Sequence, residues 1–395
     1  MASTDLIHEA WSVLTQCSTT SGIMASPNHA DNYRRIWSRD AMMAGVASVF
    51  HGHESMIAVH RSSIITLMRA QAFDGQLPSN VTVEEKRTSF GGLAGRVDAT
   101  TWWLVGAGVY LLHSKDDELK TQLAGSVERA FQVLHSWEMN HGGFIYTPLG
   151  GNWADEYICQ GYVLYDQLVR LWALRLHANV YQRSDWKLLA EQLTKRISDH
   201  FSSDGKQEAV MHPRAFEKAK EKEGRYWWFQ FGPQGYDTRF DLAANALALL
   251  LGFDQKIKST AAFLNELAVN QQSWMIPAFY PTIQQGDAEW SLLAENYAYD
   301  FKNFPGHFHN GGAWPIFMGW MIAALNLHNE RFTATAMQRE LEHTLVSNTH
   351  QPFFEYWHIK EKKAGGKFPL AYSATGCLLA NLSPDQMETI KIYLQ

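Results

Sequence analysis

The sequence predicts an all-α fold: a single domain over residues 1–395 in which six helical hairpins close into an (α/α)6 barrel. The first observation is helical periodicity, with apolar residues at three- and four-residue spacing in about a dozen segments. The second is that loops rich in glycine, proline and aromatic residues recur after every second helix or so. The third is the lack of a linker, of a low-complexity run and of a repeat with a fixed period. This last feature favours a closed barrel over a solenoid of helix pairs.

The predicted helices follow one another along the whole chain, and alternating strand-like runs between them are few and short. The helical segments are Leu6–Leu14, Ala41–Phe50, Ser55–Ala72, Thr100–His113, Leu119–Met139, Gly161–Val180, Lys187–Phe201, Phe240–Leu251, Ser259–Val269, Trp314–Leu327, Ala334–Val346 and Ala371–Asn381. The loops with the most unusual composition are Asp74–Asn80, Phe90–Arg96, His141–Trp153, Gln230–Tyr236 and Pro305–Gly312. In such a barrel the longer loops lie at one end, so we expect their side chains to build a pocket there.

Charge and composition limit the classes of partner. The net charge of −6 is spread along the chain, which argues against nucleic acid and anionic membranes as partners. The sequence contains neither a signal-peptide pattern nor the ~20 apolar residues that a membrane-spanning helix needs. Cys17, Cys159 and Cys377 are far apart and unlike any zinc-binding spacing. We therefore expect a cytoplasmic protein with a small-molecule substrate, no metal and no organic cofactor, which could form a homo-oligomer.

The segment Phe308–Pro315 carries the strongest local signal, because it combines histidine, asparagine, two glycines and tryptophan. Glycine lets a backbone come close to a ligand, tryptophan offers a flat apolar face, and histidine and asparagine form hydrogen bonds. This combination suits the binding of a sugar ring. The structural alternative is a turn before a helix, with proline in the first helical turn. The 15 Trp, 15 Tyr and 21 Phe of the chain favour the sugar-binding interpretation.

Carboxylates are the candidate catalytic groups, because the sequence has no cysteine–histidine metal pattern, no Gly-x-Ser-x-Gly and no phosphate-binding glycine loop. Asp98 stands out, since it begins a predicted helix and is followed by Trp102 and Trp103. Aspartate is a preferred helix N-cap, which is the structural alternative. An apolar wall would also raise the pKa of this carboxyl, so that it could hold a proton near neutral pH. A general acid acting on a glycosidic oxygen requires that property.

Three further sites, two pairs of residues and one single residue, allow both a structural and a functional interpretation. Arg39-Asp40 is either a salt bridge at a helix start or a clamp for sugar hydroxyls, and the same choice holds for Asp237 and Arg239. Glu289, beside an indole and about twenty residues before His309, is either a solvated loop residue or a catalytic carboxylate.

Taken in order, seven segments resemble motifs of the alkaline/neutral invertases, a family of glycoside hydrolases that split sucrose with inversion. The segments are Ile36–Asp40, Gly75–Pro78, Val97–Trp103, Asp237–Phe240, Tyr280-Pro281 with Glu289-Trp290, His309–Pro315 and Tyr372–Gly376. The resemblance implies an (α/α)6 barrel, with Asp98 as the general acid and Glu289 as the base that activates water. The substrate-binding residues it implies are Trp37, Arg39, Asp40, Trp103, Asp237, Arg239, His309, Asn310 and Trp314.

Departures from the family pattern keep alternatives open. The spacing from Glu289 to His309 is longer than usual, which leaves Glu295 as a rival for the base. The segment Trp153–Tyr157 lacks the basic pair that the family carries after its aspartate. The substrate could therefore be another small α-glucoside, such as trehalose, a kojibiose-like disaccharide or a compatible solute. A sugar isomerase of the N-acylglucosamine epimerase type, using histidines as acid and base, is the more distant alternative.

Overall fold

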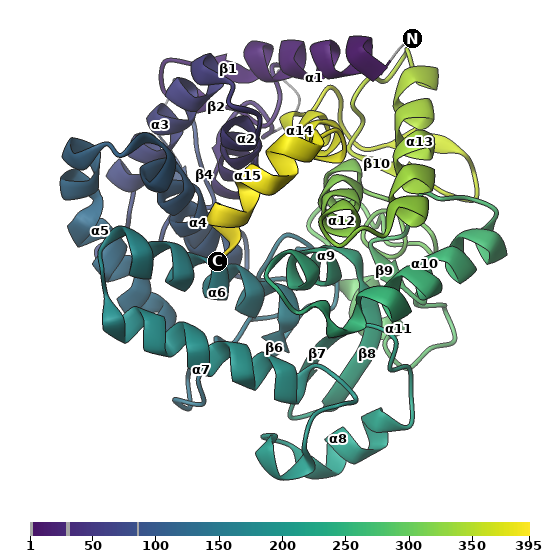
Figure 1. The fold of residues 1–395 in the computed structure, drawn as a ribbon. Coiled ribbons are helices and arrows are strands. Elements are labelled where there is room, and N and C mark those ends of the chain that lie inside the picture. Colours follow the sequence, from purple (N-terminus) through teal and green to yellow (C-terminus); the bar gives the residue numbers. More distant parts are fainter. Residues whose placement is uncertain (1–2, 29–31, 85–86) are drawn as a thin grey trace.

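Six helices form a closed inner ring in which each packs against the next and the last packs against the first (Figure 1). The computed structural model describes residues 3–28, 32–84 and 87–395. In ring order the inner helices are α2 (Ser38–His51), α4 (Val97–Ser114), α6 (Leu164–Val180), α9 (Leu242–Leu250), α12 (Pro315–Leu327) and α14 (Ala371–Ala380). Every residue of α9 is buried. A helix that is apolar all round belongs in the interior of a large fold, and the ring is that interior.

A second layer of helices lies outside the ring (Figure 1). Its members are α1 (Ser3–Cys17), α3 (Glu54–Arg69), α5 (Asp117–Ser136), α7 (Ser184–His200), α10 (Ile257–Gln271) and α13 (Arg331–Ser347). These helices are amphipathic: α7 buries Trp186, Ala190, Leu193 and Ile197, at the spacing of one helical face. The C-terminal helix α15 (Pro384–Leu394) packs against α2, α6 and α12. Among the helices that the structure describes, none combines the length and the apolar character needed to cross a membrane.

The predicted all-α class is wrong, because the chain also forms four antiparallel sheets. The largest joins β6 (Tyr162–Val163), β7 (Trp228–Gly232), β8 (Gly235–Asp241) and β9 (Phe279–Tyr280) in that order. A three-stranded sheet joins β3 (Ile36–Trp37), β4 (Asn80–Val81) and β5 (Thr88–Ser89). Two hairpins pair β1 (Ser18–Thr19) with β2 (Gly22–Ile23), and β10 (Tyr356–His358) with β11 (Lys363–Gly365). Most of these strands are too short to show an alternating pattern, and β7 is buried throughout, so its sequence does not alternate either. Two short helices, α8 (Pro213–Lys220) and α11 (Trp290–Glu295), lie in the same connecting regions.

The centre of the ring is filled by tryptophan. Trp102, Trp172 and Trp320 come from α4, α6 and α12, and all three are fully buried. Their ring centroids lie 5.9, 6.2 and 6.0 Å apart, a range in which aromatic pairs attract one another. Part of the tryptophan content, which the sequence interpretation assigned to sugar binding, therefore serves the core.

Close contact between α12 and α14 depends on two glycines. A Cβ atom on Gly319 would lie 2.1 Å from the carbonyl oxygen of Gly376, which belongs to the facing backbone. We expect Gly319→Ala to destabilise the fold by about 1–3 kcal/mol or more, because the two helices must separate. Gly125 on the outer helix α5 is the matched control: it is exposed, and its Cβ would meet only the end of the Arg129 side chain at 3.6 Å. Gly125→Ala should stabilise by about 0.5–1 kcal/mol, and urea unfolding of both variants measures the contrast.

Candidate active site

The N-terminal turns of the inner helices carry the polar side chains of the site. Short strands lead directly into three of these helices: β3 into α2, β6 into α6 and β8 into α9. Asp98 is the second residue of α4, Asp166 the third of α6, and Asp241 the N-cap of α9. The partial positive charge of a helix N-terminus favours carboxylates at these positions. One end of an otherwise apolar ring thereby becomes polar.

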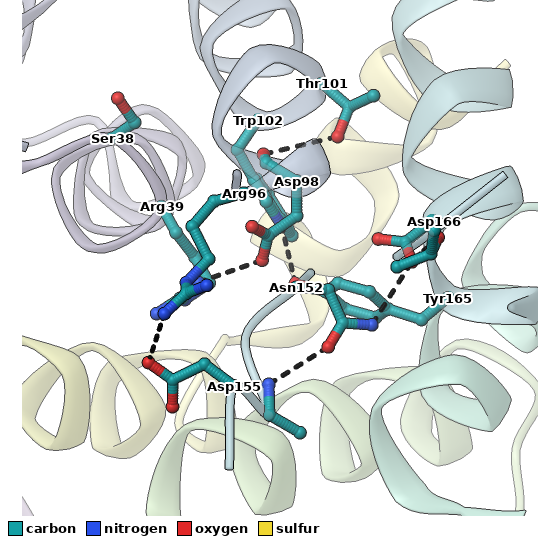
Figure 2. A network of polar contacts seen from close by, with 12 residues as sticks. Ser38, Arg39, Arg96, Asp98, Thr101, Trp102, Asn152, Asp155, Tyr165 and Asp166 are labelled. Carbon is teal, nitrogen blue, oxygen red and sulfur yellow. Dashed lines mark hydrogen bonds and ion pairs between the residues drawn. The ribbon is translucent and has the colours of Figure 1, made fainter. Parts of the chain in front are cut away.

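Asp98 is fully buried and is held by Arg39 of the neighbouring helix (Figure 2). The Nη1 atom of Arg39 donates to Oδ2 of Asp98 at 2.9 Å. Among the residues that the structure describes, Oδ1 of Asp98 has no hydrogen-bond partner. Burial raises the pKa of the Asp98 carboxyl, and the Arg39 charge opposes that rise without cancelling it. The carboxyl therefore combines a fixed orientation with an increased tendency to hold a proton.

Arg39 lies at the centre of a small charged group. Its guanidinium lies 5.9 Å from the centre of the Tyr372 ring, which belongs to the first turn of α14. The neighbouring Asp40 is buried, and this burial raises the pKa of its carboxyl to about 6, with Arg39 opposing the rise and Asp98 adding to it. The N-terminal turns of α2, α4 and α14 thus meet at Arg39.

A second network fastens the loop before β6 to the same end of the ring (Figure 2). Nη2 of Arg96 donates to Oδ2 of Asp155 at 2.8 Å, and Nδ2 of Asn152 donates to Oδ2 of the fully buried Asp166 at 3.1 Å. The backbone N–H of Ala154 donates to Oδ1 of Asn152 at 3.1 Å. Burial raises the pKa of the Asp166 carboxyl well above its usual range. These bonds hold residues 152–155 beside Asp98.

Glu289 belongs to a separate charged group built on β8. Nη2 of Arg239 donates to Oε1 of Glu289 at 2.9 Å, and the same guanidinium forms an ion pair with Asp237. The Glu289 side chain is 44% exposed, whereas Asp237 and Arg239 are largely covered. Glu295, the rival position, ends α11 and is exposed to solvent. Glu289 is therefore the one of the two glutamates that is anchored to the sheet.

The segment 153–157 connects the two charged groups. Asp155 faces Arg96 near Asp98, while the buried Tyr157 lies close enough to Arg239 and Glu289 for their charges to act on its hydroxyl. Burial raises the pKa of Tyr157; Arg239 lowers it, and the Glu289 charge raises it further. Nδ2 of Asn296, just after α11, donates to the carbonyl oxygen of Tyr157 at 2.9 Å. Asp98 and Glu289 consequently flank one short stretch of backbone.

Aromatic rings pack against one another beside the segment 153–157. His309 stacks on Trp314 with ring centroids 5.4 Å apart and an angle of 15° between the planes, and its edge meets Trp153 at 5.3 Å. His309 is buried, which lowers its pKa well below the usual range; the nearby charges of Lys302 and Arg39 act in the same direction. The imidazole is therefore neutral, and its Nδ1 has no hydrogen-bond partner among the described residues.

The structure does not bring every predicted binding residue to this group. Trp103 is fully buried between α4 and α3, where its indole N–H donates to the carbonyl oxygen of Ile64 at 3.1 Å. The buried amide of Asn310 joins two loops: its Nδ2 donates to the carbonyl oxygens of Ile283 and Asn303 at 2.9 and 3.0 Å. Trp37, in contrast, is the N-cap of α2, two residues before Arg39; it is half-buried and donates to the carbonyl oxygen of Asn32 at 3.1 Å.

Asp166 and Asn152 are among the site residues that were absent from the sequence prediction. Asp166 is a charged residue inside an apolar helical segment, a pattern that costs free energy unless the group is bonded. An aspartate in such an apolar segment is therefore the sequence signal that could have identified Asp166 as a site residue. The role of Asn152 depends on its contact with Asp166 across the loop, which no local pattern shows.

Comparison with known proteins places the chain in a family. The model of the alkaline and neutral invertase family matches residues 165–382, more than half of the chain. Neutral/alkaline invertase 3, chloroplastic, from Oryza sativa subsp. japonica is 22% identical over 97% of this chain and 74% of its own length. Alkaline/neutral invertase E, chloroplastic, from Arabidopsis thaliana is also 22% identical, over 95% of this chain and 71% of its own.

Two solved structures share the fold at low sequence identity. The GH63 mannosylglycerate hydrolase from Thermus thermophilus in complex with glucose superimposes with a TM-score of 0.63 and 13% identity, over 95% of this chain and 99% of that one. The rhamnosidase from Klebsiella oxytoca with rhamnose bound also has a TM-score of 0.63, with 14% identity, over 95% of this chain and 63% of that one. The matched residues include β8, Glu289 and the segment Phe308–Pro315 that carries His309. This chain therefore belongs to the alkaline and neutral invertase family and is a glycoside hydrolase.

Proposed function

We propose that the chain hydrolyses sucrose by a single displacement at the anomeric carbon of the glucosyl unit, with inversion of configuration. Asp98 donates a proton to the bridging oxygen, and Glu289 removes a proton from the attacking water. The observation that supports this proposal most directly is the state of Asp98: it is buried, it is oriented by Arg39, and its pKa is raised. A general acid must hold its proton at the working pH, and burial favours the protonated form.

The base has different requirements, which Glu289 meets. It must reach water and must be held in position, and the Glu289 side chain is partly exposed while Arg239 binds its Oε1 atom. The opposite oxygen, Oε2, would then accept the proton of the attacking water. In an inverting mechanism the two carboxyl groups are about 6.5–9.5 Å apart, which leaves room for that water.

The charge balance of the site favours a neutral sugar. Four cations of the described residues in this region each lie beside a carboxylate: Arg39 beside Asp98 at 2.9 Å, Arg96 beside Asp155 at 2.8 Å, Arg239 beside Glu289 at 2.9 Å and Lys302 beside Glu156 at 3.9 Å. An anionic substrate would have to displace one of these carboxylates to form an ion pair with a cation of the site. A neutral sugar instead finds donors and acceptors for its hydroxyl groups in the same ion pairs, in Asp237, which also pairs with Arg239, and in the buried carboxyl of Asp40.

A substrate panel tests this choice. We expect kcat/KM to be largest for sucrose among sucrose, trehalose, kojibiose and mannosylglycerate. The released monosaccharide is measured in each case: glucose from the first three and mannose from mannosylglycerate. A preference for trehalose or kojibiose would move the proposal to another neutral α-glucoside. A preference for mannosylglycerate would contradict the charge argument, because glycerate carries a carboxylate.

The pH dependence of the reaction depends on Arg39. The acid acts in its protonated form, so kcat/KM falls as the pH rises through the pKa of Asp98. Because the Arg39 charge lowers that pKa, Arg39→Gln is expected to move the alkaline limb of the profile to higher pH, alongside a loss of activity. Arg129→Gln, which changes an exposed arginine on α5, should leave the limb in place. An alkaline limb that moves to lower pH in the Arg39 variant would show that another group controls it.

A further inference from the structure

Three side chains beside the turn that carries His309 form a cluster that the proposed reaction does not use. His307, His358 and Glu361 each offer one ligand atom, and these atoms all lie within 4.8 Å of one another. Nε2 of His307 lies 3.0 Å from Oε1 of Glu361, and the ring centroids of the two histidines are 4.2 Å apart. His307 and His358 are far apart in the sequence, so no local spacing marks the cluster.

The backbone that carries these residues is already fixed. His358 ends β10, and in the β10–β11 hairpin it pairs with Lys363. The hairpin is joined to the His309 turn by two hydrogen bonds, from the N–H of Ala313 to the carbonyl of Trp357 at 3.0 Å and from the N–H of Trp357 to the carbonyl of Ala313 at 2.8 Å. On the other side, the N–H of His307 donates to the carbonyl of Phe304 at 2.9 Å. The three ligands thus meet with little loss of backbone freedom.

Space and burial also suit a bound ion. A Cβ atom on Gly365 would lie 2.7 Å from Nε2 of His358, so the missing side chain makes room for this imidazole. His358 is only 7% exposed, and among the described residues its Nδ1 has no hydrogen-bond partner. A buried ring nitrogen without a partner costs free energy, which a metal bond would offset.

We propose that His307, His358 and Glu361 bind one divalent transition-metal ion of the Zn²⁺ type, which fastens the β10–β11 hairpin to the turn carrying His309. Two imidazoles and one carboxylate are a ligand set that Zn²⁺ accepts, with a fourth position for water. Two nitrogen donors disfavour Mg²⁺ and Ca²⁺, which prefer oxygen. The ion acts on the structure rather than on the glycosidic bond, so this inference stands apart from the proposed reaction.

The cluster contains its own competitor. Nζ of Lys363 lies 2.5 Å from Oε2 of Glu361, where it neutralises the carboxylate that the ion would use. Removing this ammonium should free the carboxylate without touching a ligand. Lys363→Met is therefore expected to tighten metal binding, whereas Glu361→Gln is expected to weaken it. Opposite effects from two neighbouring substitutions would be hard to obtain from a general disturbance of the hairpin.

Isothermal titration of the full chain with ZnCl2, after treatment with a chelator, tests the site. We expect one ion per chain, with affinity lowered at least roughly 10–100-fold in Glu361→Gln and His358→Gln, because direct ligands matter at least as much as the groups that orient them. His8→Gln, an exposed histidine on α1, is the control and should bind as the parent does. If thermal unfolding shows that His358→Gln does not fold, the test rests on Glu361→Gln, because the Glu361 side chain is partly exposed and its replacement should leave the fold intact. Absence of binding, or equal affinity in the parent and Glu361→Gln, would overturn the proposal.

Discussion

Asp98→Asn is expected to lower kcat for sucrose by about 10²–10⁴-fold while the protein remains folded. Asparagine has nearly the same shape, and its Oδ1 can still accept the hydrogen bond from Arg39 that Oδ2 of Asp98 accepts at 2.9 Å. It has no carboxyl proton to give to the bridging oxygen. Removing a buried carboxyl whose pKa is raised should not harm the fold, because burial of its charged form is unfavourable.

A change of leaving group separates the loss of the acid from a loss of binding. Fluoride departs with little need for a proton, so α-glucosyl fluoride should be hydrolysed by the Asp98→Asn variant far better than sucrose is, relative to the parent. Turnover of both substrates near the parental rate would mean that Asp98 is not the acid. Equal loss on both substrates would give Asp98 a role in binding alone.

Glu289→Gln is expected to lower kcat by a similar factor, about 10²–10⁴-fold, and to do so for sucrose and for α-glucosyl fluoride alike. The reason is that both substrates need an activated water, whatever group leaves. Glutamine keeps the contact between Arg239 and Oε1 that the structure shows at 2.9 Å, but it does not accept a proton from water at neutral pH.

Glu295→Gln is the matched control for this substitution. Glu295 ends the same short helix, α11, that begins after Glu289, and it is exposed. The same chemical change there should leave kcat within about twofold of the parent, as is usual for exposed positions away from special contacts. A large loss in Glu295→Gln together with normal activity in Glu289→Gln would transfer the role of base to Glu295.

The sequence was informative wherever chemistry is local. Asp98 and Arg39 each lie in a short motif, and the structure joins them through one ion pair. Inner helices such as α12 were visible because a long apolar run that follows a proline signals a buried helix. The predicted start at Trp314 is the N-cap of this helix, so the boundary differs by one residue.

The remaining features depend on contacts between distant segments. Trp103 follows Asp98 closely in sequence, yet helical geometry turns it to the opposite face of α4, against Ile64. Asn310 belongs to a motif typical of sugar binding, but its amide holds two loops together. The strands escaped prediction because most are only two or three residues long, and because β7 is buried throughout and so lacks the alternation that marks a strand; its pairing with β8 is a tertiary contact.

The stereochemistry of the first product tests the central claim most directly. Proton NMR of the enzyme acting on sucrose can follow the anomeric signal of released glucose before mutarotation mixes the two forms. Because the glucosyl unit of sucrose is α-configured, a single displacement by water predicts β-glucose as the initial product. Initial release of α-glucose would contradict the account, since it would require a covalent intermediate or cleavage on the fructosyl side.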